Sequence, residues 1–244
     1  MRKTYVYIIS ILCLGFSMAA SAQDEPPDTV VIPLKIRAGL ELAGPVIYFT
    51  DKNNLSFEGY VSGDLNEKMA IFLGGGYADF KYSQYNYDYL SRGVFIKAGV
   101  DFNLLKPEIN MGKYWAGIGL HYGQSIFTSE TPSFEHENYW GTIASSIPLR
   151  TSWGHFLEIS PGFKAELFNN FSIGWSVSLR RLIYSGTSKD LMPVSIPGFG
   201  TGGKTMSFAM NYFITINIPY RKIRVVIKKE PPEETEEVTA PQNP

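Results

Sequence analysis

The 244-residue chain carries 22 basic and 23 acidic side chains, so it lacks the basic excess of a nucleic-acid-binding protein. Aromatic residues make up 14% of the chain, including 16 Phe and 15 Tyr. The mean hydropathy of −0.07 is nevertheless too low for a bundle of membrane-spanning helices.

The first 22 residues have the layout of a secretory signal peptide. Arg2 and Lys3 precede an apolar run over 5–18, and residues 20–22 read Ala-Ser-Ala, a pattern that signal peptidase recognises. The apolar run is shorter than the about 20 residues of a helical membrane span. We therefore expect cleavage before Gln23.

Cleavage would remove Cys13, which is the one cysteine of the chain. The mature protein would then have no disulfide, no thiolate nucleophile and no cysteine-based metal site. A lipoprotein alternative at Cys13 is disfavoured, because Leu12 stands where a lipobox needs a small residue. Residues 23–33 are expected to form a periplasmic linker.

Beyond this linker, apolar and polar residues alternate with period two, which is typical of strands with one apolar and one polar face. In the first strand the apolar set is Leu34, Ile36, Ala38, Leu40 and Leu42. Farther along, Val94, Ile96, Ala98, Val100, Phe102 and Leu104 alternate with Phe95, Lys97, Gly99, Asp101 and Asn103. Eight strands are predicted, at 34–43, 54–64, 69–82, 92–105, 113–127, 153–167, 171–184 and 204–220.

The predicted connections alternate between short and long. The short ones are 65–68, 106–112 and 168–170, and the long ones are 44–53, 83–91, 128–152 and 185–203. This asymmetry is typical of outer-membrane barrels, and strands of 10 to 17 residues reach the about 9–11 needed to cross a bilayer. We predict an all-β fold, an eight-stranded antiparallel up-and-down transmembrane β-barrel over 34–220. It would be integral to the bacterial outer membrane, with both termini periplasmic.

A soluble barrel of lipocalin type is the structural alternative. If the apolar sets face lipid, aromatic residues gather at both ends of the barrel as interfacial girdles, which favours the membrane protein. Closure would also remove exposed strand edges. The girdle residues would be Phe102, Tyr114, Phe168, Phe171 and Tyr220 at the short-turn end and Phe80, Tyr82, Phe127, Trp153, Phe156 and Tyr184 at the other.

After Tyr220 the composition changes. Five basic residues over 221–229 are followed by a segment rich in Pro and Glu. Residues 221–244 are therefore expected to form a disordered periplasmic tail. A contact to peptidoglycan or to a protein partner is the functional alternative.

The inward strand faces carry five basic and five acidic residues. An eight-stranded barrel has an interior only wide enough for side chains, and buried charges are tolerated there when they are paired. A structural ion-pair network is the favoured interpretation, and a narrow gated channel whose salt bridges switch partners is the alternative. The set is Lys35, Arg37, Glu41, Glu58, Lys97, Asp101, Glu158, Lys164, Glu166 and Arg180.

Residues 198–205 match the phosphate-binding pattern G-x-x-x-x-G-K-[ST]. That chemistry needs a helix to follow the loop, whereas the residues after Thr205 alternate as a strand does. The signal peptide also exports the chain away from nucleotides. We expect neither nucleotide nor nucleic acid as a partner.

The three histidines lack metal-ligand spacing, so no metal or other cofactor is expected. His155, Glu158 and Ser152 could form a catalytic group only with help from another strand. An outer-membrane lipid hydrolase is therefore a second alternative, and we expect no enzymatic activity.

Two long loops carry clusters of aromatic residues. Exposed aromatics can anchor an extracellular protein or glycan, or they can extend the interfacial girdle against outer-membrane lipid. The candidates for partner contact are Tyr85, Tyr87, Tyr89, Phe134, Tyr139 and Trp140.

Four segments, 93–103, 116–123, 168–176 and 196–200, carry a family resemblance through their residues, order and spacing. Together they resemble an uncharacterised domain-of-unknown-function family of bacterial outer-membrane β-barrel proteins, over Leu34 to Tyr220. The resemblance implies the fold and the location, and it implies no catalytic residues. His121 departs from it, because an arginine is expected there. We expect a structural role or a partner-binding role through the loops.

Overall fold

The computed structural model describes residues 29–84, 86–139, 141–168, 170–186 and 192–226, with the backbone alone for 136–138. The chain divides into two compact units. One comprises residues 31–225 and contains the barrel. The other combines 1–30 with 226–244, and most of it lies outside the described residues, as do the predicted signal peptide and most of the predicted tail.

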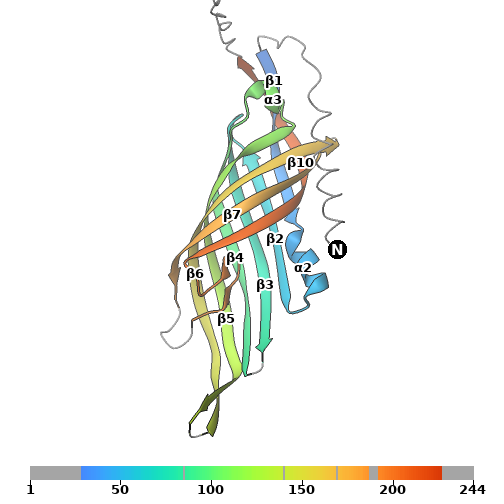
Figure 1. Cartoon of the computed structure of the whole chain (residues 1–244). Helices are drawn as coiled ribbons and strands as arrows, with labels where there is room; N and C mark the ends of the chain where they lie inside the picture. The colour runs from blue at the N-terminus through green and yellow to red at the C-terminus, as the bar shows by residue number, and fades with distance from the viewer. Residues whose placement is uncertain (1–28, 85, 140, 169, 187–191, 227–244) are drawn as a thin grey trace, which may run out of the picture. The chain divides into compact units, whose positions relative to one another are not determined.

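Eight antiparallel strands close into a barrel in the order β1-β10-β7-β6-β5-β4-β3-β2 (Figure 1). Each strand neighbours the next barrel strand in sequence, and β1 closes against β10, which confirms the predicted up-and-down topology. The strands are β1 (Thr29–Glu41), β2 (Asn54–Asp64), β3 (Met69–Gln84), β4 (Tyr87–Asn103), β5 (Tyr114–Asn138), β6 (Gly141–Phe168), β7 (Phe171–Ser185) and β10 (Met206–Val226).

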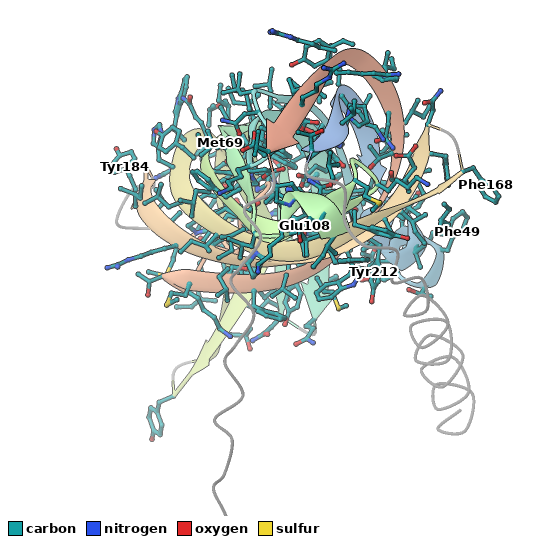
Figure 2. All side chains as sticks on the ribbon, turned by 90° about the horizontal axis from the view of Figure 1, so that it is seen from above. Phe49, Met69, Glu108, Phe168, Tyr184 and Tyr212 are labelled. Carbon is teal, nitrogen blue, oxygen red and sulfur yellow. The ribbon has the colours of Figure 1, made fainter. Side chains whose placement is uncertain are left out.

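Two short helices and a two-stranded hairpin complete the described structure. They are α2 (Ala43–Thr50), α3 (Pro107–Asn110) and the pair β8 (Ser195–Ile196) and β9 (Gly200–Thr201). None of the described helices is long and apolar enough to cross a membrane. Seen down the barrel, α3 lies across the short-turn end, with Glu108 near the middle (Figure 2).

The alternation of side chains sorts the strands into two faces as predicted. On β4, Ile96 is 60% exposed, whereas Lys97 beside it is 2% exposed. The paired residues Ile71 and Val100 of β3 and β4 lie on the outward face in the same way. Aliphatic side chains thus cover the outside of the barrel and charged ones fill the inside. This arrangement is that of a transmembrane barrel, because an apolar outer band is stable only in lipid.

The predicted aromatic girdles are confirmed in part. Trp153 and Tyr184 at the long-loop end are exposed, and Phe168 and Tyr184 point away from the barrel (Figure 2). Phe127 and Phe156, by contrast, are fully buried inside. The prediction was wrong for these two residues because it relied on their location at strand ends. Their positions in the two-residue alternation place both side chains on the inward face.

Phe80 and Tyr82 also belong to the inward face rather than to a girdle. They pair with Ser91 and Tyr89, which are both buried, so all four side chains share one face of the β3–β4 hairpin. The rings of Phe80 and Tyr82 stack with centroids 6.5 Å apart.

The first strand differs from the prediction at its short-turn end. Leu34, expected to face lipid, is buried, and so is the next residue, Lys35. The backbone N–H of Lys35 donates to Asp64 Oδ2 at 2.9 Å. The alternation therefore shifts phase at this point. β1 also begins five residues earlier than predicted, and β10 continues six residues beyond the predicted end at Tyr220.

Two of the predicted long loops are largely strand. β3 and β4 pair as far as Gln84 with Tyr87, and β5 and β6 pair as far as Asn138 with Gly141. Register shifts interrupt the β5–β6 ladder between Ser129 and Phe134. The segments 83–91 and 128–152 are therefore hairpins that prolong the barrel wall.

The predicted loop 44–53 contains the helix α2. The carboxylate of Glu41 accepts hydrogen bonds from the backbone N–H groups of Ala43 (2.6 Å) and Gly44 (2.9 Å) at the start of this helix. Acceptors at a helix N-terminus satisfy N–H donors that have no partner within the helix, and Pro45 has no N–H group and so needs no acceptor there. The helix was missed because these signals are short and lie in an apolar, β-branched segment.

The helix α2 takes the place of the long-loop half of β1. The β1–β2 pairing ends at Leu40 with Gly59, and the backbone N–H of Leu42 donates to the carbonyl oxygen of Tyr212 on β10. β2 and β10 both continue farther toward the long-loop end, over 54–58 and 206–211. One strand of the wall is thus absent between them at this level.

Candidate functional site

A cluster of charged side chains occupies the centre of the barrel, with Glu158 of β6 in the middle. Its Oε2 lies 3.2 Å from Lys97 Nζ and 2.6 Å from Arg180 Nε. Its Oε1 lies 3.1 Å from His121 Nδ1. His121, Glu158 and Arg180 are direct cross-strand neighbours on β5, β6 and β7, so the strand register alone brings them together.

The cluster extends to both sides through further carboxylates. Lys97 Nζ also lies 2.5 Å from Glu58 Oε1. Asp101 Oδ1 lies 3.0 Å from His121 Nε2, and Asp101 Oδ2 lies 3.4 Å from Lys164 Nζ. Charges in such a core are stable when each has a partner, and breaking a buried pair costs about 3–5 kcal/mol.

Two more ion pairs lie at the short-turn end. Lys35 pairs with Glu166 and Arg37 pairs with Asp64. Lys35 Nζ additionally donates to the carbonyl oxygen of Gly112 at 2.7 Å, which connects β1 to the α3 turn. Asp64 was not among the predicted interior charges, although the alternation along β2 would have placed it on the inward face.

Nine of the ten predicted interior charges are therefore in ion pairs. The tenth, Glu41, caps α2 instead. His121 stands where the family resemblance predicts an arginine, and its imidazole bridges two carboxylates, those of Asp101 and Glu158.

An aromatic layer packs against the central cluster. The rings of Phe72 and His121 stack with centroids 4.1 Å apart, and Tyr60 stacks on Phe72 at 5.3 Å. Lys164 Nζ lies 4.9 Å from the ring centre of Tyr60 and 4.7 Å from that of Trp115. These cation–π contacts add to its pairing with Asp101.

The segment 192–203 folds into the long-loop end of the barrel. Ile196 and Phe199 are buried against Phe127 and Phe156, with Leu182 packed beside them. Ser91 Oγ donates to the carbonyl oxygen of Ser195 at 3.0 Å. We call residues 192–203 the plug segment.

The plug segment explains the glycine-rich pattern at 198–205. Gly198 has φ +75°, and a Cβ there would lie 2.5 Å from the ring of Phe95. Only glycine fits this tight turn. A strand follows it rather than a helix, so the geometry that a phosphate-binding loop requires is not formed.

The free space between these layers is small. The cavity beside His121, Glu158 and Lys164 has a volume of about 20 Å³, and that beside Lys35 and Glu166 about 10 Å³. Each is comparable to the about 10–15 Å³ that a single water molecule needs. Side chains, rather than a column of water, therefore fill the barrel around the ion pairs.

The candidate catalytic residues do not come together. Glu158 and Ser152 are buried on the inward face of β6, whereas His155 lies on the outward face. There His155 Nδ1 lies 2.6 Å from the hydroxyl of Tyr122, and its ring lies beside that of Tyr184. The grouping was wrong because residues three apart on a strand point to opposite faces. Within the described ranges, no cluster of three His, Cys, Asp or Glu residues could hold a metal ion.

The loop aromatics divide into different environments. Tyr139 is 92% exposed, and Tyr87 and Phe134 are half-buried. Tyr89 is fully buried beside the plug segment, which corrects its assignment as a contact for an external partner. Tyr85 and Trp140 lie outside the described residues.

The chain was compared with known families, curated sequences and solved structures. No curated protein sequence matches the chain. Among solved structures, Ail, the attachment invasion locus protein of Yersinia pestis, has 10% identity and a TM-score of 0.38, with 80% of this chain and 97% of Ail covered. CarO2 of Acinetobacter baumannii has 14% identity and a TM-score of 0.37, with 78% and 99% covered.

Neisserial surface protein A has 9% identity and a TM-score of 0.32, with 80% of this chain and 98% of that protein covered. None of these likenesses bears on activity. Residues 4–223 match the family described as domain of unknown function DUF6048, which confirms the resemblance inferred from the strand segments. Because that match spans most of the sequence, the chain belongs to the DUF6048 family.

Proposed function

We propose that this protein is a non-conducting outer-membrane barrel that presents the β5–β6 hairpin at the cell surface as a binding arm for an extended peptide of another protein. The short-turn end and both termini would face the periplasm. The asymmetry between short and long connections supports this orientation. The ion-pair core and the plug segment support the absence of conduction.

The observation that carries the proposal is a free strand edge on the hairpin. β6 pairs with β7 from Gly154 onward, and the backbone N–H of Gly186 donates to the carbonyl oxygen of Trp153. Farther out, residues 142–149 of β6 pair with β5 alone among the described strands. Their second edge therefore offers backbone donors and acceptors to a partner strand.

The composition of this edge fits an added strand. Residues 142–149 read Thr-Ile-Ala-Ser-Ser-Ile-Pro-Leu, without a charge, and Ile143 is 57% exposed. Proteins usually protect a free edge with charged residues, because an uncharged edge accepts other strands. Here Pro148 removes one N–H group and the remaining positions are open to pairing. Recognition by strand addition combines such backbone hydrogen bonds with side-chain pockets.

The test is selection of random ten-residue peptides displayed on phage against the protein in nanodiscs. Selected peptides should lose at least tenfold in affinity for the double variant Ile143→Lys/Ser145→Lys, because charges at the edge disfavour pairing. The control Gln84→Lys adds a charge at an exposed position of the same end and should leave affinity unchanged. Equal binding to both variants, or failure to select any peptide, would contradict the binding role.

The orientation has a separate test, since the mature chain is expected to lack cysteine. Tyr139→Cys should react with a membrane-impermeant maleimide on intact cells. Lys113→Cys, at the other end of β5, should react only after the outer membrane is permeabilised. The reverse pattern would refute the proposed orientation.

A further inference from the structure

A cavity of about 360 Å³ lies in the long-loop half of the barrel, between α2, β2, β10 and the plug segment. Its volume falls within the about 300–1,000 Å³ of small-molecule binding pockets. It is much larger than the voids around the ion pairs, so it is not a packing defect of the same kind. We call it the lateral pocket.

The lateral pocket lies where the barrel wall lacks a strand. β1 ends at Glu41, whereas β2 and β10 continue beside the gap over 54–58 and 206–211. Neighbouring strands are about 4.7–4.9 Å apart, so removing one opens the wall by a full strand width. The helix α2 covers this opening only in part, since the cavity extends past it to β10.

The pocket reaches the lipid-facing surface of the barrel. Ile47 of α2 and Met210 of β10 both line it, and each is 46% exposed. Phe49 and Tyr212 point outward on the same side of the barrel (Figure 2). An apolar ligand could therefore enter from the membrane, between α2 and β10, without passing the plug segment.

The inner end of the lateral pocket is polar, and its charged side chains already have partners: Glu41 accepts from the start of α2 and the others are in ion pairs. Glu58 pairs with Lys97, and Arg180 pairs with Glu158. Asn211 Nδ2 donates to Ser178 Oγ at 2.8 Å, and its amide oxygen can still accept. A charged ligand group would be buried here without a counter-ion, which is costly. An uncharged group that forms hydrogen bonds avoids this cost.

The outer end is lined by the apolar side chains of Ile47 and Met210. Three small residues, Ala43, Ala78 and Ala209, line the pocket from α2, β3 and β10. Because they carry no bulky side chain, they leave the room that a ligand would occupy.

We propose that the lateral pocket binds one neutral, single-chain amphiphile taken from the surrounding membrane. Its uncharged head, a hydroxyl, ester or amide, lies at Asn211 and Arg180. Its alkyl chain lies between α2 and β10 and ends in the lipid. This ligand class follows from the gradient from matched polar groups inside to exposed apolar groups outside. It is independent of the binding role proposed for the β5–β6 hairpin.

The experiment uses the protein in phosphatidylcholine nanodiscs with a twelve-carbon monoacylglycerol that carries a photoactivatable diazirine on its chain. Labelled peptides are identified by mass spectrometry. We expect saturable labelling of α2 and of the start of β10, with one probe per barrel. Unlabelled monolauroylglycerol should compete at least tenfold better than lauric acid or dodecylamine, whose heads are charged.

Two variants fill the pocket and one serves as the matched control. Ala209→Phe and Ala78→Phe should each reduce saturable labelling at least tenfold. Ala98→Phe adds the same side chain on the lipid-facing side of β4 and should change labelling less than twofold. Heat-modifiable migration on a gel verifies that each variant is folded.

Equal labelling of the filled variants and the control would overturn the proposal. So would labelling spread evenly around the apolar band, or equal competition by lauric acid. If neither filled variant folds, the competition series on the unchanged protein decides the question.

Discussion

Neutralising Glu158 should destabilise the barrel more than any single change at its surface. In Glu158→Gln, Lys97 keeps its partner Glu58, whereas Arg180 loses its carboxylate at 2.6 Å. The amide retains the size of the side chain and some hydrogen bonding, so the loss is mainly one of charge. An unmatched buried charge costs about 3–5 kcal/mol, which corresponds to a shift of roughly 10²- to 10³-fold or more in the unfolding equilibrium.

The assay is urea-induced unfolding of the protein in lipid vesicles, followed by tryptophan fluorescence and by heat-modifiable migration. The control Glu135→Gln removes a carboxylate from the exposed hairpin and should change stability by less than about 0.5 kcal/mol.

A second variant separates charge balance from packing. Arg180→Gln added to Glu158→Gln restores neutrality, so the double variant should be more stable than the sum of the two single effects predicts. The coupling should lie at the upper end of the about 0.5–3 kcal/mol seen for residues in contact. A Glu158→Gln protein within about 1 kcal/mol of the unchanged protein, or strictly additive effects, would refute the view that matched charges hold this core together.

Three further outcomes are expected. Gly119→Ala should lower the free energy of unfolding by about 1–3 kcal/mol, because a Cβ there would lie 2.7 Å from His121 Nε2 and from Asp101 Oδ1. Gly63→Ala, with open space around it, should leave stability nearly unchanged in the same urea assay. Phe199→Ala should lower the free energy of unfolding by about 3–5 kcal/mol, because it leaves a cavity beside the plug segment. Planar-bilayer recordings of this variant should show no conductance, since the ion-pair core below is intact. An open pore would show that the plug segment alone closes the barrel. His155→Ala should leave lipid A unchanged by mass spectrometry, because His155 and Glu158 lie on opposite faces of β6; altered lipid A would revive the hydrolase.

The strand alternation carried most of the successful predictions. Lys97 and Glu158 could be assigned to the interior because side chains on a regular strand alternate between its two faces. The same rule would have placed Phe127, Phe156 and His155 correctly, because the odd or even position of each residue along its strand determines which face it occupies. These residues were misjudged where residue type was weighed above parity.

The sequence by itself determined the closed eight-stranded fold, its apolar outside and its charged inside, because period-two patterning is local and needs no knowledge of partners. Only the tertiary structure decided which charges meet. Pairing depends on register between strands far apart in the chain, as for Lys35 with Glu166 and His121 with Glu158. It also decided that β1 stops early, that α2 fills part of the gap and that the plug segment folds inward. Each of these depends on how much space the closed barrel leaves, and that space exists only once all eight strands are in place.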